Sequence, residues 1–404
     1  MGYTFSEKAI GKKAGRAVRA GECVIVPVDV VMASDTTGPI AIKAFQDMGG
    51  KRPAKPERSF FILDHAVPCP TEKIANLHSL IRSFCREQGC ILYDQEAGVC
   101  HQVMLEHEHV HQGDIVLGAD SHTSSYGAVG AFSTGVGSTD LGAALLTGKT
   151  WLRVPETVKV HMTGRLHPGV SAKDVILKII SDITSDGATY MTMEFCGDGF
   201  AAFSREEAVT VCNMAIEAGG KTGVFVPALT DPDLIPDQDA QYARELFYRA
   251  EDIVPMVACP HSVDNGKPAS ALAGQKIDLV YLGSCTNARL SDIKIAADIL
   301  RGRKIATRML ICPASSAVLS EAARLGFLSD LIASGAAFSA PGCGLCVGTL
   351  GGVPGNGESV LSTTNRNFLG RMGNNKSFVY LASPATAAAT ALRGTITDPR
   401  EVLA

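Results

Sequence analysis

The sequence predicts an α/β fold with largely parallel sheets, and three observations support this. Short apolar runs recur along the chain, and most of them end in a polar or glycine-rich loop. Segments with the periodicity of helices that have one apolar face lie between these runs. The 404 residues are more than one ordinary hydrophobic core holds, so two or three domains are expected. Strands that alternate with helices are typical of parallel sheets covered by helices.

The apolar runs are the expected strands, each short enough to be buried on both faces of a sheet. They comprise residues 24–26, 60–63, 115–117, 279–282, 309–311 and 378–381. One expected helix begins at Ser171, with Asp174 as its capping partner. Its apolar face carries Ile176, Ile179, Ile180 and Ile183. A second helix covers residues 290–300, and a third begins at Ser383 with Pro384 in its first turn.

The composition is that of a globular protein and gives no reason to expect nucleic acid or a membrane as partner. Hydrophobic residues make up 46% of the chain, charged residues make up 19%, and the net charge is −4. The basic residues are scattered. No apolar run approaches the ~18 residues of a membrane span, and the N-terminus lacks the apolar core of a secretory signal. Twelve irregularly spaced cysteines favour a reducing cytoplasm over a disulfide scaffold.

Polar motifs follow three of the expected strands. They are DH at 64–65, DSH at 120–122 and SCTN at 284–287. Ligands of open α/β sheets bind beyond the carboxyl ends of the strands, so we expect these motifs to share one site. A histidine oriented by a carboxylate can deliver a proton to a departing hydroxyl group. One such pair alone would favour a loop histidine that caps backbone groups, whereas two pairs in equivalent positions favour catalysis.

The pair Cys343 and Cys346 forms a CxxC motif, which redox proteins, zinc sites and iron–sulfur clusters all use. The glycines after Cys346 do not favour the helix of a thioredoxin-type site, and no fourth zinc ligand is evident. Cys285 is the natural third ligand, because a helix start favours the thiolate. Three thiolates around a [4Fe–4S] cluster leave one iron free to act as a Lewis acid. A zinc- or redox-active CxxC protein is the alternative.

The remaining cysteines are expected to be inert, which is the usual state of a buried thiol. They are Cys23, Cys69, Cys85, Cys90, Cys100, Cys196, Cys212, Cys259 and Cys312. Arg366 and Arg371, in an irregular Asn- and Gly-rich loop, can each present a guanidinium fork to a carboxylate. His101 fits either a packed core or a site, and the run HEHVH at 107–111 is expected at the surface. The segment GVGSTDLG at 135–142 lacks the GxGxxG spacing of a dinucleotide site.

Five motifs together resemble the aconitase family, in the order that the family has them. They are DHAVPCPTEK, GADSHTSSYGAVGAFSTGVGSTD, YLGSCTNARLSDI, PGCGLCVG and STTNRNFLGRMG. The likeness covers essentially the whole chain and is greatest to members with separate large and small subunits. It implies three α/β/α sandwich domains around a central iron–sulfur site, at about residues 1–152, 153–272 and 273–404. It also implies one [4Fe–4S] cluster per subunit, held by Cys285, Cys343 and Cys346, with one iron not ligated by protein.

The resemblance assigns further site residues. Those implied for the acid and hydrogen-bond network are Asp64, His65, His101, Asp120, His122 and Glu217. Those implied for substrate binding are Ser34, Asp35, Ser121, Asn213, Asn365, Arg366 and Arg371. Asn213 and Glu217 are four residues apart and are therefore expected on one helix face. Ser34 stands where close relatives carry His or Gln, a difference near the expected substrate.

The activity implied is that of a hydro-lyase and isomerase acting on a small hydroxy dicarboxylate or tricarboxylate. The leading substrate is 3-isopropylmalate, which would place the chain in leucine biosynthesis; homoaconitate, 2,3-dimethylmalate and citrate-type acids follow. The expected partner is a small subunit carrying a mobile fourth domain with the serine base, in a heterodimer or heterotetramer. An RNA-binding role, known for some relatives, is disfavoured by the lack of a basic stripe.

Overall fold

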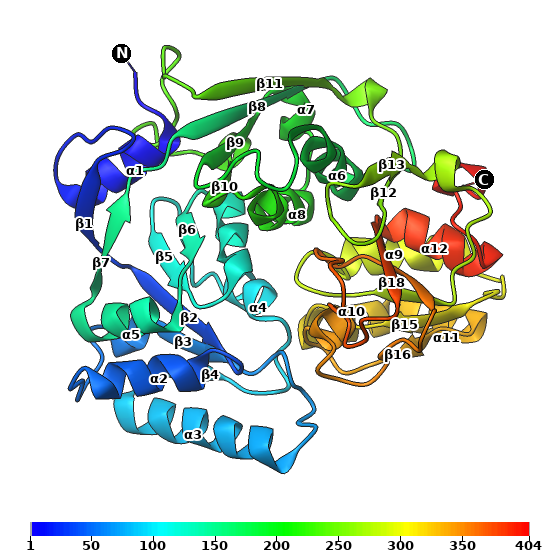
Figure 1. Ribbon diagram of the computed structural model, residues 1–404, viewed down its shortest axis with the longest axis horizontal. Helices are drawn as coiled ribbons and strands as arrows, with labels where there is room; N and C mark the ends of the chain where they lie inside the picture. Colours follow the sequence, from blue (N-terminus) through cyan, green and yellow to red (C-terminus); the bar gives the residue numbers. More distant parts are fainter. Residues whose placement is uncertain (1, 404) are drawn as a thin grey trace.

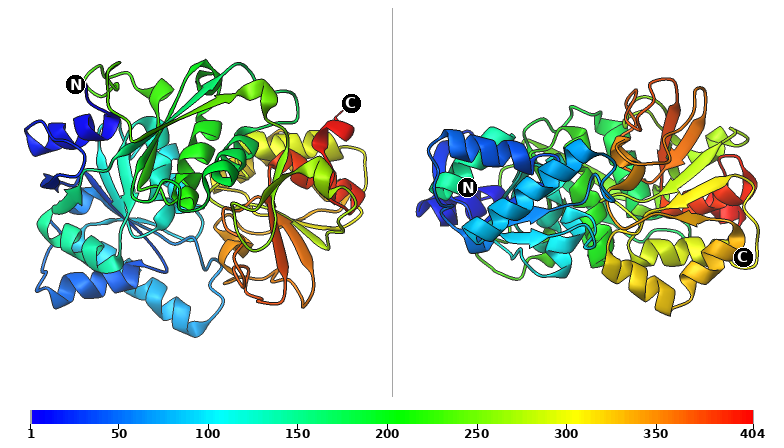
Figure 2. Two further views of the ribbon diagram at one scale, coloured as in Figure 1. Left: turned by 45° about the horizontal axis from the view of Figure 1, so that its top comes forward. Right: turned by 90° about the horizontal axis from the view of Figure 1, so that it is seen from below.

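The computed structural model describes residues 2–403, and within them the strands form three mainly or wholly parallel sheets and one small ribbon. In Figure 1 the first sheet and its helices lie at the left, the second lies across the top, and the third lies at the right. The view from below keeps this order, with the middle of the chain between the two ends (Figure 2). The predicted α/β class with largely parallel sheets is confirmed.

The first sheet has five parallel strands in the order β4-β3-β2-β5-β6. Side chains alternate between the faces of a strand, so Val31 and Phe61 pack against helices on the outer face while Val30 and Phe60 face the molecular centre. The strands are β2 (Val30–Ser34), β3 (Ser59–Ile62), β4 (Ile91–Tyr93), β5 (Ile115–Gly118) and β6 (Phe132–Gly135). The helices are α2 (Gly38–Asp47), α3 (Glu72–Gln88) and α5 (Ser138–Thr147) outside, and α4 (Cys100–Glu106) inside.

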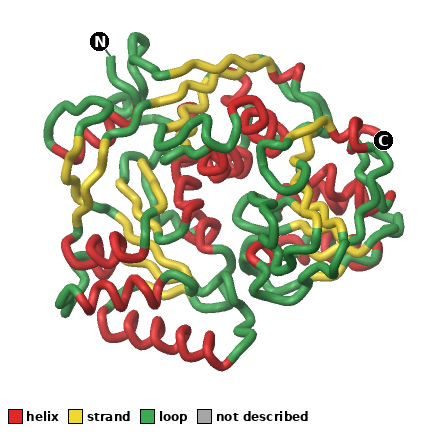
Figure 3. Tube along the Cα trace, viewed as in Figure 1, coloured by secondary structure: helices red, strands yellow, loops and turns green. Residues whose placement is uncertain are grey.

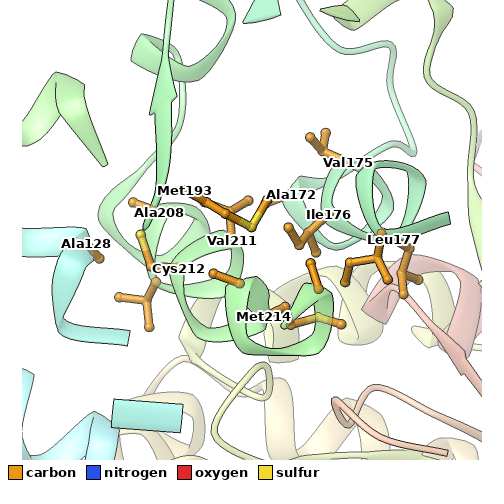
Figure 4. Packing of buried hydrophobic residues seen from close by; sticks show 14 of the residues in the cluster. Ala128, Ala172, Val175, Ile176, Leu177, Met193, Ala208, Val211, Cys212 and Met214 are labelled. Carbon is orange, nitrogen blue, oxygen red and sulfur yellow. The ribbon is translucent and has the colours of Figure 1, made fainter. Parts of the chain in front are cut away.

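The second sheet has four parallel strands in the order β10-β9-β8-β11. Figure 4 shows Met193 from this sheet, Ile176 from α6 and Val211 from α8 gathered in one core. The strands are β8 (Thr157–Thr163), β9 (Thr192–Cys196), β10 (Thr222–Phe225) and β11 (Arg244–Arg249). The helices are α6 (Ala172–Ile183), α7 (Asp198–Ala201) and α8 (Arg205–Asn213).

The third sheet has seven strands in the order β13-β12-β18-β17-β14-β15-β16, and β12 runs antiparallel to both of its neighbours. Val280 and Leu282 pack outward against helices, whereas Leu279 and Tyr281 face the centre. The strands are β12 (Met256–Ala258), β13 (Gly266–Pro268), β14 (Leu279–Leu282), β15 (Arg308–Ile311), β16 (Ala337–Phe338), β17 (Ser359–Ser362) and β18 (Phe378–Ala382). The helices are α9 (Leu290–Leu300), α10 (Ser316–Arg324), α11 (Phe327–Ser334) and α12 (Pro384–Arg393).

One of the buried hydrophobic clusters contains residues from all three sheets. Val30, Val158 and Tyr281, one residue from each sheet, belong to the same buried cluster. In Figure 3 green loops run between the left and right parts of the molecule. Strand β12 already belongs to the third sheet, although it precedes the predicted domain start at residue 273. The division into three domains itself stays a prediction.

The prediction that residues 24–26 form a strand buried on both faces was wrong in one respect. They do form a strand, β1 (Cys23–Pro27), but it pairs antiparallel with β7 (Lys149–Arg153) in a separate two-stranded ribbon. Ile25 and Trp151, paired across the ribbon, are 71% and 64% exposed. The other face packs against α1 (Phe5–Ala14), where Val24, Val26 and Leu152 join Phe5 and Ile10 in one buried cluster.

The three helices expected from capping signals are confirmed. Ser171 and Asp174 form a capping box at the start of α6, α9 covers 290–300, and the Ser383 side chain caps α12 by accepting a hydrogen bond from the backbone of Thr386. None of the helices in the described residues is both long and apolar enough to span a membrane.

Candidate active site

The polar motifs that follow the strands meet around one cavity of about 210 Å³ at the junction of the first and third sheets. Its walls consist of Thr36, Asp64, His65, Val99, Cys100, His101, Asp120, Ser121, His122, Cys285, Cys343, Cys346, Val347, Thr349, Asn365, Arg366 and Arg371. The carboxyl ends of β3, β5, β14 and β17 supply many of these residues, because each strand end is followed directly by one of the motifs. The expectation that the motifs share one site is therefore met.

Cys285 lies in a tight turn between β14 and α9. Ser284 and Ala288, on either side of it, have φ angles of 88° and 68°, which side chains other than glycine rarely adopt. The buried guanidinium of Arg289 holds this turn from within, donating from Nη2 to Cys285 O at 2.7 Å and from Nη1 to Thr286 O at 2.6 Å. The strained turn is thus fixed by charge-assisted hydrogen bonds.

Cys343 directly precedes the short 3₁₀ turn η7 (Gly344–Val347) and Cys346 lies in it, so the CxxC does not open a regular helix. The turn docks on two neighbours: the Cys343 backbone N–H donates to Asp64 O at 2.8 Å, and the Tyr281 hydroxyl donates to Cys343 O at 3.1 Å. Gly344 has a φ of +62°, and a Cβ there would lie 2.2 Å from the Tyr281 hydroxyl oxygen. Only glycine fits this close approach.

Nitrogen donors contact two of the three thiols. The side-chain amides of Asn213 and Asn365 donate to Cys285 Sγ at 3.3 and 3.2 Å, and Arg371 Nη2 donates to Cys346 Sγ at 3.4 Å. A hydrogen bond from Cys343 and the charge of Arg371 hold the pKa of Cys346 well below its usual range. Burial raises the pKa of Cys285 to about 11. The donors and the buried thiols fit an anionic metal–sulfur group.

The spacing of the thiols argues against a single zinc ion. Thiolates bound to one zinc at ~2.3 Å lie within ~4 Å of one another. In the described part of the chain, the one group of three candidate ligands whose atoms all lie within 4.8 Å is Asp35, Asp64 and His65, not the three cysteines. The wider spread of the sulfur atoms favours a group with several metal ions.

Asp120 is the centre of a histidine network. Its carboxylate is hydrogen-bonded to His101 Nε2 at 3.0 Å and accepts from the His122 backbone N–H at 2.8 Å, and it lies 3.5 Å from His65 Nε2. Burial acts to raise the pKa of Asp120, but the three histidines outweigh it and hold that pKa well below its usual range. His101 also contacts the hydroxyl of Tyr126, at 3.1 Å from Nδ1. Asp120 is therefore an anion that orients three imidazoles toward the cavity.

His65 is bracketed by carboxylates. Its Nδ1 lies 2.7 Å from Asp64 Oδ1, and its backbone N–H donates to Asp35 Oδ1 at 3.0 Å. Burial acts to lower the pKa of His65, but the charge of Asp64 and the hydrogen bonds to Asp120, Asp35 and Asp64 raise it well above its ordinary value. The Asp35 carboxylate is also held by His78 Nε2 at 3.1 Å. His65 can thus keep a proton inside the buried cavity.

Arg366 reaches the same network from the third sheet. Its Nε lies 3.1 Å from both carboxylate oxygens of Glu217, and its Nη2 donates to Ser121 Oγ at 3.0 Å. Glu217 is in turn 2.8 Å from His122 Nε2. Burial acts to raise the pKa of Glu217, but His122 and Arg366 lower it below its ordinary value. The guanidinium is therefore held in place beside the histidines.

Four of the predicted site residues do not line the cavity. Ser34 and Asp35 lie behind its wall: Ser34 is fully buried and its hydroxyl is 2.9 Å from that of Thr36, which does line the cavity. Asn213 and Glu217 reach it only through their partners. The expectation of one regular helix face for these two was wrong, because α8 ends at Asn213 and Glu217 belongs to the 3₁₀ turn η3 (Met214–Ala218).

Several residues of the site were missed or differently interpreted at first. Cys100, expected to be inert, lines the cavity. Thr36 and Thr349 carried no signal beyond their position beside predicted motifs. The histidines at 107 and 111 are exposed as expected, whereas His109 is half-buried with Nε2 2.6 Å from the Tyr93 hydroxyl.

Comparisons with known proteins show the family to which the chain belongs. A family model described as Aconitase family (aconitate hydratase) matches residues 8–234 and 263–394. The 3-isopropylmalate dehydratase large subunit 1 of Methanopyrus kandleri is 44% identical over 418 residues, covering 100% of both chains. The homoaconitase large subunit of Thermus thermophilus is 44% identical over 412 residues, covering 100% of this chain and 98% of the other.

A solved structure supports the fold independently. The holo-form of Thermococcus kodakaraensis aconitase X superposes with a TM-score of 0.54 at 15% identity, covering 89% of this chain and 87% of that one. At this identity the likeness concerns the fold alone. The family match and the full-length relatives carry the assignment, and on that evidence the chain belongs to the aconitase family.

Proposed function

We propose that the chain is the large, cluster-bearing subunit of a hydro-lyase and isomerase that acts on a small hydroxy acid, with 3-isopropylmalate as the leading substrate. The observation that carries the proposal is the convergence of three thiols, a carboxylate–histidine network and two guanidiniums on one cavity. Relatives named 3-isopropylmalate dehydratase large subunit and homoaconitase large subunit support the same reaction class. Homoaconitate and 2,3-dimethylmalate are the alternative substrates, and leucine biosynthesis in the cytoplasm is the setting we propose.

Membership of the aconitase family implies an iron–sulfur cluster. We assign its ligands as Cys285, Cys343 and Cys346, in one [4Fe–4S] cluster per subunit with one iron not ligated by protein. When bound, the cluster supplies a Lewis acid for the oxygen atoms of the substrate. The side chains of Asn213, Asn365 and Arg371 hold the sulfur atoms from outside, and this contact orients the ligands and stabilises their thiolate form.

The arginines bind the carboxylates of the substrate. Arg366 and Arg371 both line the cavity, and a guanidinium fork matches the two oxygens of a carboxylate. The contact of Arg366 with Glu217 fixes its orientation before substrate arrives, which reduces the entropy lost on binding. Ser121, a hydrogen-bond partner of Arg366, is placed to contact the same carboxylate.

The proton for the departing hydroxyl comes from the network around Asp120. Three imidazoles approach this carboxylate, and His65 retains its proton because Asp64, Asp120 and Asp35 raise its pKa. A proton held at this position can pass to a leaving oxygen in the cavity, and the anionic Asp120 stabilises the charged form of its neighbours. His65 and His101 are the groups we expect to contact the hydroxyl.

The base that removes the Cα proton comes from a partner in this proposal. We infer a small subunit with a mobile fourth domain, in a heterodimer or heterotetramer, because the relatives named above are large subunits. Both chains contribute to the substrate-binding site. The part of the pocket that distinguishes one hydroxy acid from another therefore lies partly on the partner.

The test is an anaerobic hydratase assay of the chain together with its small subunit against a panel of unsaturated diacids. We expect activity with the acid derived from 3-isopropylmalate, and loss of most of it in Arg366→Lys, which keeps the charge but not the fork. Arg249→Lys, at a side chain 70% exposed, is the matched control and should be unaffected. Absence of activity with every diacid, in protein that contains one zinc and no sulfide, would overturn the proposal.

A further inference from the structure

A buried lysine lies behind the loop that carries Asn365 and Arg366. Lys173, in the first turn of α6, is 1% exposed. Its Nζ donates to Thr363 O at 2.7 Å and to Thr364 O at 2.8 Å. These two carbonyls follow directly after β17, in a different sheet from α6. One ammonium group thus connects the second and third sheets at the back of the cavity.

The position of Lys173 is unfavourable by the rules that apply to a helix alone. A cation in the first turn opposes the helix dipole, which favours negative charge there. Burying an ammonium is costly unless it is paired, and within residues 2–403 no carboxylate forms an ion pair with Lys173. Burial accordingly lowers the pKa of Lys173 to about 7. The free-energy cost of burying this ammonium group must be offset by neighbouring groups.

The two carbonyls and the negative charges of the site offset part of this cost. The charges that favour the ammonium form of Lys173 are, in order, those of Cys285, Asp292, Glu217 and Cys346. Two of these are thiols of the cavity, and Glu217 is the partner of Arg366. The ammonium therefore lies behind the loop whose next residue, Asn365, donates to Cys285 Sγ at 3.2 Å.

The two hydrogen bonds also determine how the loop is oriented. Each peptide unit is planar, so fixing Thr364 O fixes the peptide plane that leads into Asn365. The Thr363 hydroxyl, on the adjacent peptide unit, exchanges hydrogen bonds of 3.0 Å with both the N–H and the carbonyl of Gly283, two residues before Cys285. Loss of the Lys173 hydrogen bonds would thus shift the backbone before Asn365 and, through Gly283, the backbone before Cys285.

We propose that Lys173 is a positioning residue for Asn365 and Arg366 and the buried cation that balances the negative charge of the sulfur site. This rests on the proposed function for its effect on turnover, but its effect on the cluster is independent of the substrate. It makes no contact with substrate, and acts through two backbone carbonyls and through its charge.

Two substitutions separate these roles from a general effect on folding. Lys173→Met keeps the length of the aliphatic stem and removes the charge and the donors, and Lys173→Gln removes the charge but keeps an N–H donor. Lys178→Met is the control, because Lys178 lies on the same helix in an exposed ion pair with Asp182. The readouts are the reduction potential of the cluster and the kcat and KM of the complete enzyme.

We expect both Lys173 variants to lower the reduction potential, since a nearby cation stabilises the more negative reduced cluster. We expect Lys173→Met to raise KM by roughly ten- to a hundredfold, the effect of losing a charged hydrogen bond, and Lys173→Gln to raise it less. Unchanged potentials together with an unchanged KM in folded variants would overturn the proposal. If the complete enzyme lacks activity altogether, the proposed function fails while the potential still tests Lys173.

The unaltered protein provides a measurement that no folding defect can obscure. With ¹⁵N-labelled lysine side chains, the cluster-loaded chain should show a slowly exchanging ammonium signal, because Nζ is buried and bound to two carbonyls. A neutral amine, or no protected lysine signal, would contradict the inference.

Discussion

Replacement of Arg289 by methionine removes the guanidinium that holds the turn around Cys285. In the folded chain Arg289 is 2% exposed and donates to the carbonyls of Cys285 and Thr286 at 2.7 and 2.6 Å. Its Nε also donates to Gln102 Oε1 at 3.0 Å. Methionine fills a similar volume but offers no donor, so Cys285 O loses this hydrogen bond and Thr286 O keeps only the one from the Thr210 hydroxyl, at 3.0 Å.

The magnitude follows from the acceptors left behind. A buried acceptor without a partner costs about 1–3 kcal/mol, and Cys285 O is the carbonyl that loses its donor. Removing a buried cation returns part of its desolvation cost, which is real here because burial lowers the pKa of Arg289. The free energy of unfolding should therefore fall by about 2 kcal/mol. The turn should also loosen, so that Cys285 holds its ligand position less firmly.

Urea unfolding and iron content of anaerobically prepared protein measure both effects. Arg301→Met is the matched control, because Arg301 follows the last residue of the same helix and pairs with Asp330 at the surface, at 2.8 Å. A surface pair contributes about 0–1 kcal/mol, so this variant should keep its stability and its iron. If Arg289→Met has the same free energy of unfolding and the same iron content as Arg301→Met, the hydrogen bonds from Arg289 to the Cys285 turn do not stabilise the protein.

Two further changes test the site and the core. Glu217→Gln removes a carboxylate that raises the pKa of His122, so an NMR titration should show a lower pKa for His122. KM should rise because Arg366 loses the partner that orients it. An unchanged titration of His122 would refute the contact. Burial raises the pKa of Glu194 from 4.5 to about 7, so the unfolded chain ionises first and stability falls as pH rises from 4.5 to 7, by roughly 3 kcal/mol. Glu194→Gln should lack this decline in urea unfolding at pH 5 and pH 8, and a parallel decline in both proteins would show that Glu194 is not its source.

Much of the site could be predicted because its residues follow directly after strands. An apolar run such as 60–63 ends in Asp64, and in a parallel sheet all such ends meet at one edge. The CxxC alone could not distinguish zinc, redox and cluster chemistry. The three-dimensional spacing of the thiols was needed to favour a group with several metal ions.

Other residues could not be predicted because their role depends on neighbours far along the chain. In the sequence, Lys173 looks like an ordinary lysine of an amphipathic helix. Its burial is explained by the packing of α6 against the end of β17. Its place in the first turn of a helix, where a cation is unfavourable, was the one available signal. Thr36 rather than Ser34 lines the cavity because β2 ends at Ser34 and the chain then turns. Periodicity does not indicate such a turn.

The central claim is that Cys285, Cys343 and Cys346 hold a cluster with one iron open to substrate. Mössbauer spectroscopy of ⁵⁷Fe-labelled, anaerobically purified protein tests it most directly, with and without the hydroxy acid. We expect the spectrum of a [4Fe–4S] cluster in which one iron of the four changes when substrate is added, and loss of that spectrum in Cys346→Ser. A spectrum that does not change with substrate, or protein that contains zinc and no sulfide, would contradict it.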